Sequence, residues 1–162
     1  MYKPMTNDLR SKIQMYIKNK LDISSLIEDI NLKGEDLSFA IIKRFNRIDC
    51  DLQGVNWAHA ILGNPDRLDF TVIRCNISNS NFEGTIFEKS WIRSCKALNC
   101  NFRNSDVSKV SYNHTDFGEG TTFCGAIIRI GTKEGIGCHF PSSMWKDLTE
   151  GWDTTIEVKD KK

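Results

Sequence analysis

The chain has 162 residues, of which 40% are hydrophobic and 27% are charged, as in an ordinary soluble globular protein. Its formal net charge is +1, so no overall field draws it to nucleic acid or anionic lipid, and direct nucleic-acid binding is not expected. No apolar run approaches the roughly 18 residues of a membrane span, and residues 1–10 lack the apolar core of a secretory signal. We therefore expect a cytoplasmic protein whose six cysteines are reduced.

The first 29 residues predict a helical cap. A set of apolar residues recurs there with helical spacing: Leu9, Ile13, Tyr16, Ile17 and Leu21. Thr6 or Asn7 is the expected N-cap, and a second short helix is expected over 24–29. Because an open solenoid exposes unpaired edges at its ends, a helix over the first coil is the natural function of this segment.

Residues 30–129 divide into 20 consecutive blocks of five residues, with no insertion or deletion in this alignment. The third position is apolar in 17 blocks, and the exceptions are Arg47, Arg67 and Thr122. The first position is small in 15 blocks, and the second is Asn or Asp in 11. Neither the helical period of about 3.6 nor the strand period of about 2 produces this pattern. It predicts coils of short straight sides, in which the first and third residues point inward and Asn or Asp lies near the corners.

The blocks CDLQG, CNISN, SNFEG, CNFRN, SDVSK and TDFGE closely resemble the repeat of the pentapeptide-repeat family. This resemblance implies an all-β solenoid, namely a right-handed quadrilateral parallel β-helix with four blocks per coil. Twenty blocks then make about five coils, in which residues 20 positions apart stack. The expected inward columns are Leu32, Leu52, Val72, Ile92, Tyr112; Leu37, Trp57, Ile77, Ala97, Phe117; Ile42, Leu62, Phe82, Phe102, Thr122; and Arg47, Arg67, Phe87, Val107, Ile127.

Arg47 and Arg67 interrupt the fourth column, because an unpaired arginine cannot lie in a narrow apolar core. In one interpretation a local bulge turns Ile48 and Leu68 inward and both arginines out, toward Asp49 and Asp69. In the other, the two stacked arginines form a site for an anion or carboxylate. The sequence leaves both interpretations open.

Several apolar residues occupy outward positions where the repeat prefers Asn or Asp: Ile41, Ile61, Ile86 and Trp91. Phe39 and Phe123 are also outward in this register. A contiguous patch of this kind indicates a surface that binds a protein partner, or one that a terminal segment covers.

We expect no catalytic, cofactor or metal site. Four cysteines occupy the small inward position and are interpreted as core residues: Cys50, Cys75, Cys95 and Cys100. Cys138 and His139 have no second pair to complete a zinc site. His59 and His114 lack a neighbouring nucleophile or carboxylate cluster of recognisable spacing.

Residues 130–162 form the last predicted region. A short helix is expected from about 142 to 151, with an apolar side made by Met144, Trp145, Leu148 and Trp152. It either caps the last coil or forms a homodimer contact, as in several members of the family.

The function expected from these features is a non-enzymatic binding or scaffold protein that acts through its outer faces. One alternative, implied by the family, is a DNA mimic that protects type II topoisomerase. The repeat region opposes it, because 11 acidic residues are balanced by 12 basic ones. Another alternative is a structural subunit of a virion or other assembly that packs through its ends and apolar face.

Overall fold

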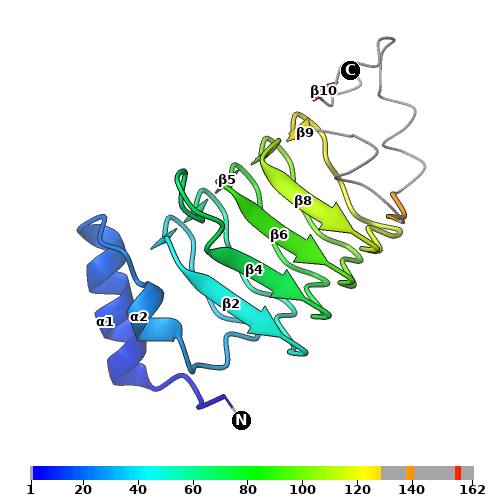
Figure 1. Ribbon diagram of the computed structural model, residues 1–162. Coiled ribbons are helices and arrows are strands. Elements are labelled where there is room, and N and C mark those ends of the chain that lie inside the picture. The colour runs from blue at the N-terminus through cyan, green and yellow to red at the C-terminus, as the bar shows by residue number, and fades with distance from the viewer. Residues whose placement is uncertain (1, 129–137, 141–155, 158–162) are drawn as a thin grey trace.

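The computed structural model describes residues 2–128, 138–140 and 156–157. The chain forms a right-handed parallel β-helix with helices at its N-terminal end (Figure 1). Successive coils lie beside one another along the axis, and each coil has four sides. The fold expected from the pentapeptide period is therefore confirmed.

Two helices cover the first coil. α1 (Asn7–Lys18) begins after Thr6, whose side chain accepts a hydrogen bond from the Leu9 amide at 3.2 Å. Thr6 is thus the N-cap, one of the two residues expected. α2 (Ser24–Ile27) follows, and its Ile27 is fully buried, as is Ile13 of α1. Together these apolar side chains close the end of the core.

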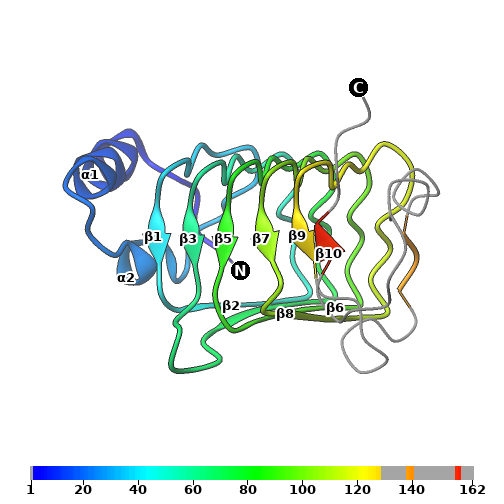
Figure 2. The same cartoon turned by 90° about the horizontal axis from the view of Figure 1, so that it is seen from above.

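Two adjacent sides of the coil contain strands (Figure 2). One side consists of the parallel strands β1 (Ile41–Ile42), β3 (Ile61–Leu62), β5 (Ile86–Phe87), β7 (Asp106–Val107) and β9 (Ile127–Ile128). β10 (Ile156–Glu157) extends this sheet as the antiparallel neighbour of β9. The other side consists of the parallel strands β2 (Phe45–Ile48), β4 (Phe70–Ile73), β6 (Ser90–Arg93) and β8 (Val110–Asn113).

The remaining two sides are joined by isolated parallel bridges and by side-chain ladders. Most Asn and Asp residues at the second position accept a hydrogen bond from the amide two residues later, as Asn81 does from Glu83 at 3.2 Å. Its amide group also bonds to the coil before it, because Asn81 Nδ2 donates to Asn56 Oδ1 at 3.1 Å and Asn101 Nδ2 donates to Asn81 Oδ1 at 3.0 Å. The repeat prefers these residues because they close the local turn and link the coils at once.

The core contains a continuous aromatic stack. The rings of Trp57, Phe82, Phe102 and Phe123 lie nearly parallel, at interplanar angles of 6°, 7° and 7°. The centroids of Phe82 and Phe102 are 4.6 Å apart, about the spacing of neighbouring strands. This column differs from the expected one, in which Trp57 would have lain beside Ile77.

The difference arises because the second coil is one block longer than the others. Ile41 pairs with Ile61, but Ile61 pairs with Ile86 and Arg47 with Val72, a separation of 25 residues. The extra block, residues 65–69, projects from the coil and forms an exposed loop. The expected columns therefore join the wrong blocks between the second and third coils, since every later block moves to the neighbouring side. The expected stack of Val72, Ile92 and Tyr112 within the later coils is confirmed.

A second departure occurs after Phe117. Asp106 pairs with Ile127, a separation of 21 residues, so one additional residue lies in the segment 118–122. Phe123 and Ile128 are consequently buried, while Ile127 is 41% exposed. The expected register, with Thr122 and Ile127 inward and Phe123 outward, is wrong here.

Candidate binding surface

Three of the four predicted surface residues form a ladder on the side made by β1, β3 and β5. Ile41 pairs with Ile61, and Ile61 pairs with Ile86, so their outward side chains lie on successive strands. Ile61 is 39% exposed and Ile86 is 43% exposed, whereas Ile41 is half-buried. Asp106 occupies the next position, and Ile127 the one after it. We call Ile41, Ile61 and Ile86 the isoleucine ladder.

An aromatic pair lies at the corner just before this ladder. Phe39 is 62% exposed, and its ring stacks on His59 with centroids 5.0 Å apart. Both residues have a positive φ, near +60°, and immediately precede the blocks that contain Ile41 and Ile61. In the next coil Gly84 takes this position, where a Cβ atom would lie 2.4 Å from His59 Nδ1. The outward position of Phe39 was expected, but its contact with His59 depends on how the coils stack.

Trp91, the fourth predicted residue, lies on a different side of the coil. It belongs to β6 and pairs with Thr71 and Ser111 in the neighbouring strands. Its ring is half-buried beneath the Arg93 guanidinium, whose carbon is 3.8 Å from the ring centroid. The expected contiguity of Trp91 with Ile86 is therefore wrong, because a corner separates β5 from β6 (Figure 2).

The predicted arginine pair is not formed. Arg47 is only 3% exposed and points inward, while Arg67 lies in the exposed loop and contacts Asp69 at 3.6 Å. The bulge interpretation is wrong for Arg47, since Ile48 is 44% exposed. Arg47 donates instead to the carbonyl oxygens of four residues: Ile27, Glu28, Ile30 and Asn46. Its guanidinium also lies 4.4 Å from the Tyr2 ring centroid.

Arg47 therefore joins the helical cap to the first coil rather than binding an anion. Three of its four carbonyl partners belong to the end of α2 and the residues that follow, where helical donors run out. Of these, the Ile27 carbonyl also accepts from the Ile30 amide at 3.2 Å. A cleft of about 400 Å³ lies beside this contact and is lined by charges of both signs, including Glu28, Asp29 and Arg44. The arginine's donors face carbonyl oxygens, so the cleft has no concentrated positive charge for a carboxylate.

The cysteines fall into two groups. Burial raises the pKa of Cys95 and of Cys100 to about 12, as expected for thiols that fill the core. Cys50 and Cys75 differ, because their sulfur atoms are 3.2 Å apart in neighbouring coils. The contact of Cys50 with Cys75 was not expected, because it joins residues 25 positions apart rather than 20.

Other predictions lie outside the described residues or concern absences. The proposed C-terminal contact residues all lie in the segment 141–155, which the structure does not describe: Met144, Trp145, Leu148 and Trp152. Within the described ranges, no group of three or more His, Cys, Asp or Glu residues has metal-binding geometry. The described helices are also too short and too polar to cross a membrane.

No protein-family model and no curated protein matches this chain. Among solved structures 24 chains match. One is trypsin-treated QnrB1, described as a plasmid-mediated fluoroquinolone resistance protein, with a TM-score of 0.41 and 14% identity over 68% of this chain and 62% of that one. This chain thus spans less than two thirds of QnrB1. Another is the pentapeptide-repeat protein Rfr23 from the cyanobacterium Cyanothece 51142, with a TM-score of 0.33, 16% identity, and coverage of 60% and 88% of the two chains.

Proposed function

We propose that this pentapeptide-repeat β-helix is a non-enzymatic binding protein that engages a protein partner through the isoleucine ladder. The observation that supports the proposal is the outward stacking of Ile41, Ile61 and Ile86 at positions where the repeat otherwise carries polar residues. Phe39 extends the same apolar surface at the corner. Contiguous exposed apolar side chains of this kind are typical of protein-binding surfaces.

The described ends of the chain leave the ladder open. α1 and α2 lie beyond β1, and β10 lies beyond β9, at opposite ends of the same sheet (Figure 2). Between them Ile61 and Ile86 keep about two fifths of their surface exposed. A partner that covers this strip would remove apolar surface worth about 25 cal/mol per Å² from water.

The test compares two substitutions of the same kind on different sides. Ile86→Asp places a carboxylate in the ladder, and Ile48→Asp places one at an equally exposed isoleucine on β2, since these residues are 43% and 44% exposed. Both variants and the native chain are used as affinity baits in extracts of the native host, after circular dichroism has shown equal folding. We expect the Ile86→Asp bait to lose a partner that the native and Ile48→Asp baits both retain. Equal recovery of every partner by all three baits would exclude the ladder as the binding surface.

Trp91 remains a separate candidate on the neighbouring side. A Trp91→Ala bait tests it independently, because Trp91 and the ladder do not share a surface. Loss of the same partner from both Trp91→Ala and Ile86→Asp would indicate a partner that wraps around the corner between the two sheets.

A further inference from the structure

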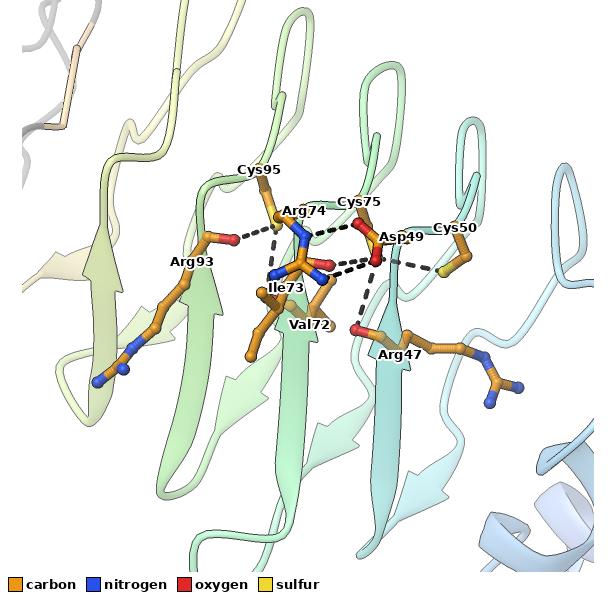
Figure 3. A network of polar contacts seen from close by, with 9 residues as sticks. All are labelled: Arg47, Asp49, Cys50, Val72, Ile73, Arg74, Cys75, Arg93 and Cys95. Carbon is orange, nitrogen blue, oxygen red and sulfur yellow. Dashed lines mark hydrogen bonds and ion pairs between the residues drawn. The ribbon is translucent and has the colours of Figure 1, made fainter.

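Two thiols face each other between the second and third coils (Figure 3). Cys50 Sγ and Cys75 Sγ are 3.2 Å apart, and both cysteines are reduced. They follow the corners at Asp49 and Arg74, where φ is +53° and +52°. The corners at Asp49 and Arg74 are thus equivalent positions in adjacent coils, and the cysteines that follow them have their sulfur atoms in contact.

An ion pair holds these two corners in register. Arg74 Nε and Nη2 each donate to a different carboxylate oxygen of Asp49, both at 2.6 Å. A bidentate contact of this kind restrains the relative orientation of its two residues as well as their distance. Because Cys50 and Cys75 are the next residues along the chain, the contact also restrains the two thiols.

The spacing of neighbouring coils suits a disulfide. Neighbouring strands lie about 4.8 Å apart, within the range of about 4.4–6.8 Å found between the Cα atoms of disulfide partners. Cys75 is buried, whereas Cys50 is half-buried and accessible to a small molecule. Cys95, the next thiol in the column, directs its sulfur to the carbonyl oxygens of Arg93 and Val72 at 3.2 and 3.4 Å.

We propose that Cys50 and Cys75 form a reversible redox site, in which a peroxide converts the two thiols to a disulfide that links neighbouring coils. The Cys50 sulfur attacks one peroxide oxygen, the O–O bond breaks, and a water molecule leaves with the thiol proton. The resulting sulfenic acid is then attacked by the Cys75 sulfur, which forms the S–S bond and releases a second water. The two thiols lose two electrons and two protons, and the peroxide is reduced to two waters.

The electrostatics of the pair favour this chemistry. The hydrogen bond between the thiols lowers the pKa of Cys75 to about 7 and raises that of Cys50, so the pair loses its first proton near neutral pH. Cys75 therefore carries the negative charge of the singly deprotonated pair, and Cys50 keeps its proton. The second step benefits most, because a thiolate is a stronger nucleophile than a thiol and Cys75 attacks the sulfenic acid formed at Cys50.

Peptide mapping tests the proposal directly. The reduced chain is treated with a few equivalents of hydrogen peroxide, its remaining thiols are alkylated, and it is digested with trypsin. Cleavage after Arg47, Arg67, Arg74 and Lys89 places Cys50 in the peptide 48–67 and Cys75 in the peptide 75–89. We expect these two peptides to be joined, and dithiothreitol to separate them. Sulfinic acid at Cys50 with Cys75 alkylated, or a link from Cys75 to Cys95, would overturn the proposal.

Two controls show whether the fold directs the reaction. Cys50→Ser should abolish the linked peptide, while Cys95→Ser, in the same column, should leave it unchanged. Oxidation in concentrated urea should spread the links over many cysteine pairs. If folded and unfolded chains gave the same distribution of links, the coil geometry would have no role and the proposal would fail.

The rate of linkage should rise several-fold as the pH increases from about 6 to about 8, because the thiolate fraction increases.

Discussion

At the scale of single residues, Arg47 shows how a position that breaks the repeat can stabilise the fold. It occupies the inward position on β2, directly beside Val72 of the next coil. Its guanidinium is buried, yet its donors are bonded to carbonyl oxygens at the end of α2 and just after it. Burying a charge is tolerated only when such hydrogen bonds replace those to water. Arg47 therefore acts as a C-terminal cap for α2 supplied from outside the helix.

Replacing Arg47 should destabilise the protein strongly. In Arg47→Leu the Glu28 carbonyl loses the arginine donor, and the Ile27 carbonyl keeps only the Ile30 amide. We expect a cost of about 2 kcal/mol, since an unsatisfied buried group costs about 1–3 kcal/mol. Arg67→Leu is the matched control, because Arg67 is exposed and its contact with Asp69 is a surface ion pair. Urea unfolding monitored by circular dichroism measures both. If the two variants had similar midpoints, Arg47 would not be the link between cap and coil.

At the scale of elements, the pentapeptide block is the unit that the fold adds or omits. The loop 65–69 is one whole block. Asn64 is the last residue of the block before it, and Phe70 is the first residue of the block after it, so the repeat continues without a shift. The sheets continue past it, because β3 pairs with β1 on one side and β5 on the other. An insertion of five residues keeps the inward and outward positions within every later block, whereas a length that is not a multiple of five must be absorbed locally, as the one extra residue in 118–122 is.

Deleting the loop tests this modularity. Removing residues 65–69 joins Asn64 directly to Phe70, as Lys89 is joined to Ser90 in the next coil. We expect a folded protein whose stability differs by roughly 1 kcal/mol or less, because a surface loop adds little to chain entropy. Removing only residues 66–69 leaves one extra residue to be absorbed in the turn, so we expect a lower midpoint in urea unfolding than for the five-residue deletion. Failure of the five-residue deletion to fold would show that the loop itself stabilises the second coil.

At the scale of the whole molecule, charge is distributed as local pairs rather than as a continuous field. Acidic side chains on the outer faces contact basic ones in adjacent coils, as in the ion pairs Asp49–Arg74, Asp51–Lys33 and Glu88–Lys109. Arg74 and Lys33 lower the pKa values of their carboxylate partners, Asp49 and Asp51, through these hydrogen bonds. A molecule that imitates duplex DNA needs an unbroken row of phosphate-like charge. These faces do not provide one.

The charge distribution leads to a direct prediction about topoisomerase. We expect the purified chain to leave gyrase supercoiling unchanged, both alone and in the presence of a fluoroquinolone, at concentrations up to tens of micromolar. A gel assay of plasmid supercoiling measures this, with a known DNA-mimic inhibitor as the positive control. Inhibition or drug protection that weakens steeply with added salt would instead support an electrostatic contact with the enzyme.

The amino-acid sequence by itself determined the local structure within most repeat blocks and the start of the helical cap. The period and short-range chemistry determine which residues point inward in most blocks, which residues close the turns and where the helical cap begins, as Thr6 and Asn81 show. The three outward isoleucines could also be predicted, because each violates the repeat at its own position. The register shift after Phe117 is also indicated by the sequence, since a polar residue, Thr122, occupies the expected inward position and the apolar Phe123 follows it.

The tertiary structure decided which blocks share a coil. A five-residue loop preserves the period and is therefore invisible to any count along the chain, yet it moves every later block to a new side. The aromatic stack, the contact of Cys50 with Cys75 and the separation of Arg47 from Arg67 all depend on that displacement. The inward position of Arg47 likewise depends on carbonyl groups contributed by α2, which its own block does not reveal. Periodicity is a local property, whereas stacking depends on how much chain each turn of the solenoid contains.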